Sequence, residues 1–188
     1  MKILASMVAC LICIMILFAG CNKKENINSS LEFSFDSEGN YEGFNDMPSD
    51  YTPEMAQKDG YFVKGYYNFV ANESLWDQFL TDSSRGNDAS IRIVKFYASD
   101  ELSYFFTDLF YRDGYYYIFE SSAESLEKKP YEHLLKLEGS LESPLEDSGV
   151  FILTNDDTLT FDTVVSKMIS SSFQYIQSIP EFRIIMFF

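Results

Sequence analysis

The chain has 188 residues, with 14 Lys and Arg against 29 Asp and Glu, so its formal net charge at pH 7 is −15. This balance argues against nucleic-acid binding, which needs a cationic surface to displace counterions from phosphates. It equally disfavours electrostatic adsorption of the protein to anionic membrane surfaces.

The N-terminus predicts export and a lipid anchor. Lys2 is followed by a nearly continuous apolar run over residues 3–18, and the segment ends in Ala19-Gly20-Cys21. A charged start, an apolar run of marginal length for a membrane span, and small residues before a cysteine are typical of a bacterial lipoprotein signal peptide. Resemblance to such lipoproteins implies cleavage between Gly20 and Cys21 and a diacylglycerol on the Cys21 sulfur. An uncleaved membrane helix is the alternative.

The predicted location is therefore the outer face of the cytoplasmic membrane, with the lipid on Cys21 as the anchor. The other cysteines, Cys10 and Cys13, belong to the predicted signal peptide over residues 1–20. After cleavage the exported domain has no free thiol, so neither a disulfide nor a thiolate metal site is expected.

Residues 21–50 are predicted to form the lipidated cysteine and a flexible acidic tether. They are rich in Asn, Ser, Glu, Asp and Gly and show little hydrophobic periodicity. Within them Leu31, Phe33 and Phe35 alternate with polar residues, so a short docking strand over residues 31–36 is the alternative.

Residues 51–188 are predicted to form a single α+β domain. Thr52 and Pro53 provide an N-cap and a first-turn proline for a helix that ends at Gly60. The elements expected after it, in chain order, are a strand over 61–69, a helix over 73–83 capped by Asn72, strands over 91–97, 102–111, 115–120, 131–141 and 150–154, a helix capped by Thr160, and a strand over 182–188. This order predicts one antiparallel sheet of about five or six strands with three helices.

The clearest local signal is Asp113-Gly114 between two aromatic runs. This pair is typical of a hairpin turn in which both residues adopt positive φ. One face of the hairpin must meet the core, and the other is either covered by the tether or the C-terminal segment or exposed as a binding patch. The possible binding surface comprises Tyr104, Phe106, Phe110, Tyr111, Tyr116, Tyr117 and Phe119.

Several stretches carry a family resemblance: Asp50-Tyr51-Thr52-Pro53-Glu54, Leu75-Trp76-x-x-Phe79-Leu80, Ile91-Arg92-Ile93-Val94 and the Asp113-Gly114 hairpin. Together they resemble an uncharacterised domain of small lipoproteins from Gram-positive bacteria. The resemblance covers roughly residues 50–120 and implies the same location and fold class. That family has no assigned activity, so it implies no functional residue.

No complete catalytic set is visible in the sequence. His133 is the only histidine, and we interpret it as a partly exposed strand residue rather than a general base. The chain has no nucleophile elbow, zinc-protease, phosphate-loop or dinucleotide motif. Carboxylates at Glu120, Glu124 and Glu127 could act on wall polymers, but no spacing singles out a pair.

Calcium binding is also not expected, and neither is any other metal or cofactor. Oxygen ligands alternate over Asp36, Glu38, Asn40 and Glu42, as they do in an EF-hand loop. Such a loop needs glycine at its sixth position, where Tyr41 stands in this chain. We interpret this stretch, and Asn155-Asp156-Asp157, as solvated acidic turns.

The leading hypothesis is a non-enzymatic, lipid-anchored module that binds a protein, peptide or cell-wall component. The anchor, the tether and the lack of a catalytic set motivate it. The alternative is an acidic shield or immunity-type protein that captures cationic antibacterial proteins. An enzyme acting on the cell wall ranks third.

Overall fold

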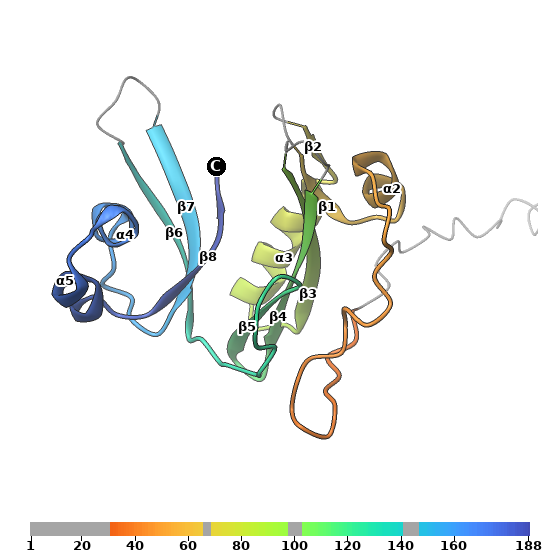
Figure 1. The fold of residues 1–188 in the computed structure, drawn as a ribbon, viewed down its shortest axis with the longest axis horizontal. Coiled ribbons are helices and arrows are strands. Elements are labelled where there is room, and N and C mark those ends of the chain that lie inside the picture. Colours follow the sequence, from red (N-terminus) through yellow and green to blue (C-terminus); the bar gives the residue numbers. More distant parts are fainter. Residues whose placement is uncertain (1–30, 66–68, 98–102, 141–146) are drawn as a thin grey trace, which may run out of the picture.

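The computed structural model describes residues 31–65, 69–97, 103–140 and 147–188 (Figure 1). The predicted signal peptide, Gly20 and Cys21 lie outside the described residues. Within the described ranges, no helix is both long enough and apolar enough to cross a membrane. The fold is α+β, as the order of elements predicted.

A five-stranded mixed sheet forms the first half of the domain, in the order β2-β1-β3-β4-β5. Its strands are β1 (Phe62–Lys64), β2 (Val70–Ala71), β3 (Ala89–Tyr97), β4 (Ser103–Arg112) and β5 (Tyr115–Glu120). Strands β1 and β3 are parallel, and the other pairs are antiparallel. The prediction of a purely antiparallel sheet is therefore wrong. The chain crosses over through helix α3 (Ser74–Ser84) and returns beside β1 in the same direction, as parallel pairing requires.

A separate antiparallel sheet contains β6 (His133–Ser140), β7 (Asp147–Thr154) and β8 (Phe182–Phe187), in that order. The prediction of one sheet is therefore wrong. After β5 the chain makes one further bridge to the first sheet, where Tyr116 and Tyr131 exchange two backbone hydrogen bonds. It then leaves that sheet, and the second sheet folds back over the first (Figure 1). Both sheets bury an apolar face in this way.

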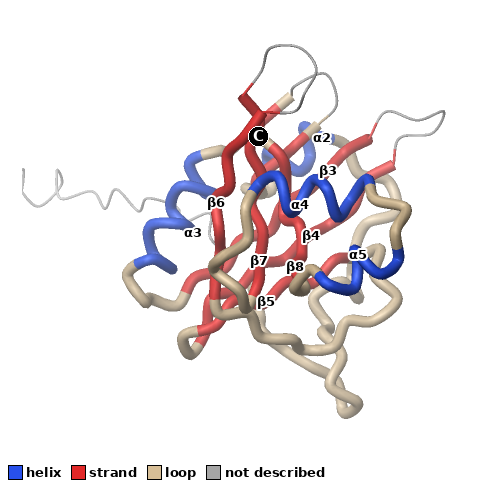
Figure 2. Tube along the Cα trace, turned by 90° about the vertical axis from the view of Figure 1, so that its left-hand side faces the viewer, coloured by secondary structure: helices blue, strands red, loops and turns tan. Residues whose placement is uncertain are grey.

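Four helices occur among the described residues, one more than predicted. They are α2 (Pro53–Lys58), α3, α4 (Phe161–Ile169) and α5 (Phe173–Ser178). Helix α4 covers the outer face of the second sheet, where Phe161 and Val164 pack on Val150 and Ile152 (Figure 2). The short helix α5, which was not predicted, has no buried residue.

Local sequence signals predicted most of the turns and caps correctly. Thr52 and Thr160 cap α2 and α4 as expected. Asp113 and Gly114 have φ values of 53° and 85°, and the hairpin pairs Tyr111 with Tyr116. Asn72 is the exception, because its side chain donates to two carbonyl groups of the α2–β1 region instead of capping α3.

The main core lies between the two sheets. Alternate residues of β3 and β4 point inward, and α3 fills the space with Trp76 and Phe79. The ring of Trp76 meets Phe151 of β7 edge-on, at a centroid distance of 4.9 Å. The second sheet also buries Leu153 and Ile185 in this cluster.

The outer face of the five-stranded sheet is covered by residues 31–50, which we call the strap. Tyr41 of the strap is 2% exposed and stacks on Phe119 at 4.2 Å. Phe33 and Phe35 pack on the same aromatic cluster of β4 and β5. Residues 31–50 therefore do not form the predicted tether, because their few aromatic side chains bury against the sheet. Phe35 forms a bridge with Tyr41, and the only assigned strand pairing of residues 31–36 is this bridge.

Candidate functional site

The aromatic surface predicted from the hairpin is part of the core. Phe106, Phe110, Tyr117 and Phe119 are each 5% exposed or less. The strap covers these four residues, while Tyr111 and Tyr116 pack partly buried on the opposite face, against the main core. Tyr104 is half-buried and donates a hydrogen bond to the carbonyl of Pro48 at 2.7 Å. The predicted binding surface is thus wrong for its buried members, since the strap and the main core cover them.

The other residues singled out in the sequence are engaged in local or structural contacts. The carboxylate of Asp36 accepts hydrogen bonds from the backbone N–H groups of Glu38 and Asn40, both at 2.8 Å. Glu120 forms an ion pair with Arg183 that joins β5 to β8. His133 is half-buried, 3.9 Å from Glu132. The described part of the chain contains no group of three or more side chains suited to hold a metal.

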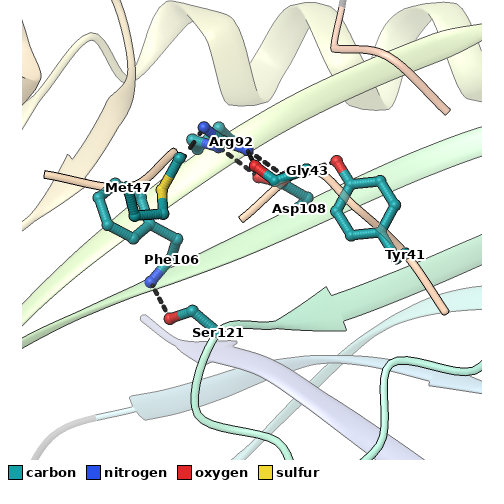
Figure 3. A network of polar contacts seen from close by, with 7 residues as sticks. All are labelled: Tyr41, Gly43, Met47, Arg92, Phe106, Asp108 and Ser121. Atoms are coloured by element: carbon teal, nitrogen blue, oxygen red, sulfur yellow. Dashed lines mark hydrogen bonds and ion pairs between the residues drawn. The ribbon is translucent and has the colours of Figure 1, made fainter. Parts of the chain in front are cut away.

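A buried ion pair lies where the strap meets the sheet (Figure 3). Arg92 of β3 and Asp108 of β4 are direct cross-strand neighbours and form two hydrogen bonds, of 2.7 and 2.6 Å. The Tyr41 hydroxyl donates to the same carboxylate at 2.7 Å, and Arg92 donates to the Gly43 carbonyl at 2.8 Å. The side chains of Arg92 and Asp108 are 6% and 0% exposed. Sheet and strap are therefore joined by one saturated polar network.

The charges of this network support a structural role. Burial raises the pKa of the Asp108 carboxyl, and the hydrogen bonds from Arg92 and Tyr41 oppose that effect. Burial also raises the pKa of the Tyr41 hydroxyl, and its bond to Asp108 raises it further. Three charge-assisted donors surround a carboxylate that has no access to solvent. Asp108 is thus unsuited to act as a catalytic base.

Two small hollows flank Arg92, with volumes of about 220 and 300 Å³. Leu31, Tyr61 and Arg92 line both of them. The Arg92 guanidinium already donates to Asp108 and Gly43. Arg112, which lines the smaller hollow, is paired with Asp88. Neither hollow therefore presents a free cation.

A third hollow, of about 560 Å³, opens between the two sheets, and we call it the groove. Strands β1 and β3 form one side, and β8 together with the end of α4 forms the other. Its lining is predominantly apolar and comprises Lys64, Gly65, Lys95, Phe96, Tyr97, Met168, Ile184, Ile185, Met186 and Phe187. The volume lies within the range of about 300–1,000 Å³ that is usual for small-molecule sites.

Two lysines stand side by side in this groove. Lys64 and Lys95 are register partners on the parallel strands β1 and β3. They share the inward face with the core residues Phe62 and Ile93, two positions earlier on each strand. The ammonium group of Lys64 donates to the carbonyl of Phe187 at 2.8 Å. Lys95 has neither a hydrogen bond nor an ion pair with any residue that the structure describes.

Burial lowers the pKa of both lysines below the usual value for the residue. For Lys95, the positive charges of Lys64 and Arg183 lower the pKa further, while Glu120 acts in the opposite direction. Carrying these charges in an apolar groove costs free energy, because burial penalises the charged form. A ligand that supplies negative charge would relieve that cost.

Sequence reasoning missed this pair because Lys64 and Lys95 are far apart in the chain. Only the parallel contact of β1 with β3 brings them together. A weak signal did exist in the alternation of each strand, since Lys64 lies on the same face as Phe62, and Lys95 on the same face as Ile93. A charged residue at a core-facing position of an apolar strand indicates a role other than packing.

Replacing Lys95 by Met is expected to stabilise the protein at pH 7, by about 0.5–2 kcal/mol. The pKa of Lys95 is lower in the folded than in the unfolded chain, so between these two pKa values the unfolded chain binds more protons. The free-energy cost of burying the charged lysine is therefore fully present below the folded-state pKa. The gain should therefore shrink as the pH rises through the folded-state pKa. Urea denaturation at several pH values measures it.

The exposed Lys58, in the last turn of α2, is the matched control for that substitution. Lys58→Met should be slightly destabilising, by less than about 1 kcal/mol, because it removes a cation from a helix C-terminus. Equal effects of the two substitutions would show that Lys95 carries no burial penalty.

Comparison with known proteins gave no match: no family model, no curated protein and no solved structure matches the chain.

Proposed function

We propose that this chain is a non-enzymatic binding module of an extracytoplasmic lipoprotein, held to the membrane through Cys21, and that it takes its ligand in the groove. The observation that carries the proposal is the pair of inward-facing lysines, Lys64 and Lys95, in a mainly apolar hollow. Natural proteins retain such destabilising groups where function needs them.

The packed strap supports a site of action close to the membrane. If Cys21 carries the lipid, only residues 22–30 separate it from the strap, which begins at Leu31. A stretch of that length reaches about 30 Å when fully extended. The proposed ligand is therefore a compound found at or near the outer membrane surface.

The contacts of the acidic residues support a binding role over catalysis. Glu120, a candidate catalytic carboxylate in the sequence, is paired with Arg183 across the two sheets. Asp108 is enclosed by Arg92 and Tyr41. Both carboxylates thus have a structural task.

The test is to follow backbone amide signals of a soluble chain over residues 22–188 by NMR while adding extract of the bacterial cell envelope. The extract is divided into a water-soluble and an organic-soluble fraction. We expect one fraction to shift the amides of Lys64, Lys95 and Ile184 to Phe187. A protein captured through acidic surface charge would leave these signals in place.

Two neighbouring residues of α4 provide a matched pair of variants. Met168 lines the groove, whereas Ile169 is 80% exposed and does not. Met168→Glu should abolish the shifts, because it places a carboxylate in the lining of the groove, and Ile169→Glu should retain them. The proposal fails if neither fraction moves the groove signals, or if both variants respond alike.

A further inference from the structure

We infer that the ligand of the groove is an anionic amphiphile with a single acyl chain and a carboxylate head. This inference rests on the proposed function and specifies its ligand class. The groove combines two features that such a molecule matches: adjacent ammonium groups on one side and apolar walls on the other.

The lysine pair provides the site for the head. Parallel neighbours such as Lys64 and Lys95 stand about 4.8 Å apart across the strands, and both side chains point to the same face. Lys64 uses one donor on the carbonyl of Phe187 and keeps two, while Lys95 uses none on any described residue. A carboxylate can therefore accept from both ammonium groups at once.

This cationic pair is a local exception in an acidic protein. The whole chain has a net charge of −15, so its overall field repels anions. The carboxylate of Glu120, which acts electrostatically on Lys95, is itself paired with Arg183. Selection of an anion thus depends on direct contact with the lysines. A purely ionic ligand would feel little electrostatic attraction before it reached them.

The opposite side suits an acyl chain. Met168, Ile184 and Met186 provide flexible or branched apolar side chains, and Phe187 of β8 and Tyr97 of β3 add rings. Methionine side chains adapt to ligands of variable shape because they are unbranched and polarisable. Each methylene that leaves water adds to the affinity. Sugars would find few polar partners on these walls.

An extended acidic peptide is the main competitor, since β8 is an edge strand. Strand addition would use the outward backbone groups of β8. The carbonyl of Phe187 already accepts from Lys64 at 2.8 Å, so the edge is partly occupied beside the lysines. The observations therefore favour an amphiphile over a peptide.

The test is isothermal titration of the chain over residues 22–188 with sodium dodecanoate below its micelle concentration, with NMR to locate the site. We expect one dodecanoate per chain, bound in the groove. Dodecyltrimethylammonium and butyrate should bind at least tenfold more weakly, since the first has the wrong charge and the second lacks the chain. The double variant Lys64→Met/Lys95→Met should lose at least tenfold in affinity, whereas Lys58→Met should not.

Circular dichroism establishes that each variant is folded, and Met168→Glu removes binding without altering either lysine. Equal binding of dodecanol and dodecanoate would overturn the inference, because the head would then not be recognised. So would a groove that responds to an aspartate-rich peptide or to phosphatidylglycerol vesicles but not to dodecanoate. In those cases the groove remains a binding site of another class. If envelope extract also leaves the groove unchanged, the proposed function itself fails.

Discussion

A chain that begins at Tyr51 is expected to lose its cooperative fold, whereas one that begins at Leu31 should keep it. Removing residues 31–50 uncovers the aromatic outer face of β4 and β5, which includes Phe110 and Phe119. Full burial of a large apolar side chain contributes about 1.5–3 kcal/mol. Several such contributions together approach the whole stability of a domain, about 5–15 kcal/mol.

The measurement is urea denaturation of the two chains, followed by near-ultraviolet circular dichroism, which reports the packing of the aromatic residues. Loss of the strap also removes the Tyr41 hydroxyl and the Gly43 carbonyl from the buried Arg92–Asp108 pair. A chain from Tyr51 that is stable to within about 1 kcal/mol of the other would show that the strap is a dispensable spacer.

Breaking the buried ion pair should destabilise the protein more than the loss of any exposed ion pair. Arg92→Met or Asp108→Leu alone is expected to reduce the free energy of unfolding by about 3–5 kcal/mol, because each leaves an unpaired buried charge. The double variant should recover much of this loss, since it leaves neither member of the buried pair charged without its partner. A double-mutant cycle in urea gives the coupling energy of the pair.

Two further variants provide reference values for the loss in the free energy of unfolding. Tyr41→Phe removes one hydrogen bond to Asp108 and should cost about 1–3 kcal/mol. Arg112→Met removes a more exposed pair, 3.5 Å from Asp88, and should cost less than about 1 kcal/mol. If Arg92→Met costs no more than Arg112→Met, the network does not hold the strap to the sheet.

Elements defined by contacts between near neighbours were predictable. The caps at Thr52 and Thr160, the helix α3 and the Asp113-Gly114 turn depend on residues a few positions apart. The hairpin register followed from the turn, because a two-residue turn determines which residues oppose each other. Asn72 failed as a cap because carbonyl groups of a distant segment compete for its side chain.

The parts that depend on distant segments were not predictable in the same way. Composition marked residues 31–50 as a tether, since polar residues outnumber the aromatic ones. Yet Tyr41 is buried, and Phe33 and Phe35 are partly buried, because they pack on the aromatic face of the sheet. The same packing covers aromatic residues of the hairpin that were predicted to form a binding surface. Sequence showed that both of its faces are apolar, but not that two separate segments cover them.

The sequence by itself determined the α+β class, the caps and turns, and the acidic balance, because each depends on composition or on nearby residues. Its prediction of a lipidated Cys21 likewise needs only the first 21 residues. The tertiary structure alone decided that there are two sheets, that the strap packs, and that Lys64 meets Lys95. The physical reason is that pairing of strands and burial of faces join residues that are distant in the chain. The choice among such contacts depends on which whole arrangement buries the most apolar surface.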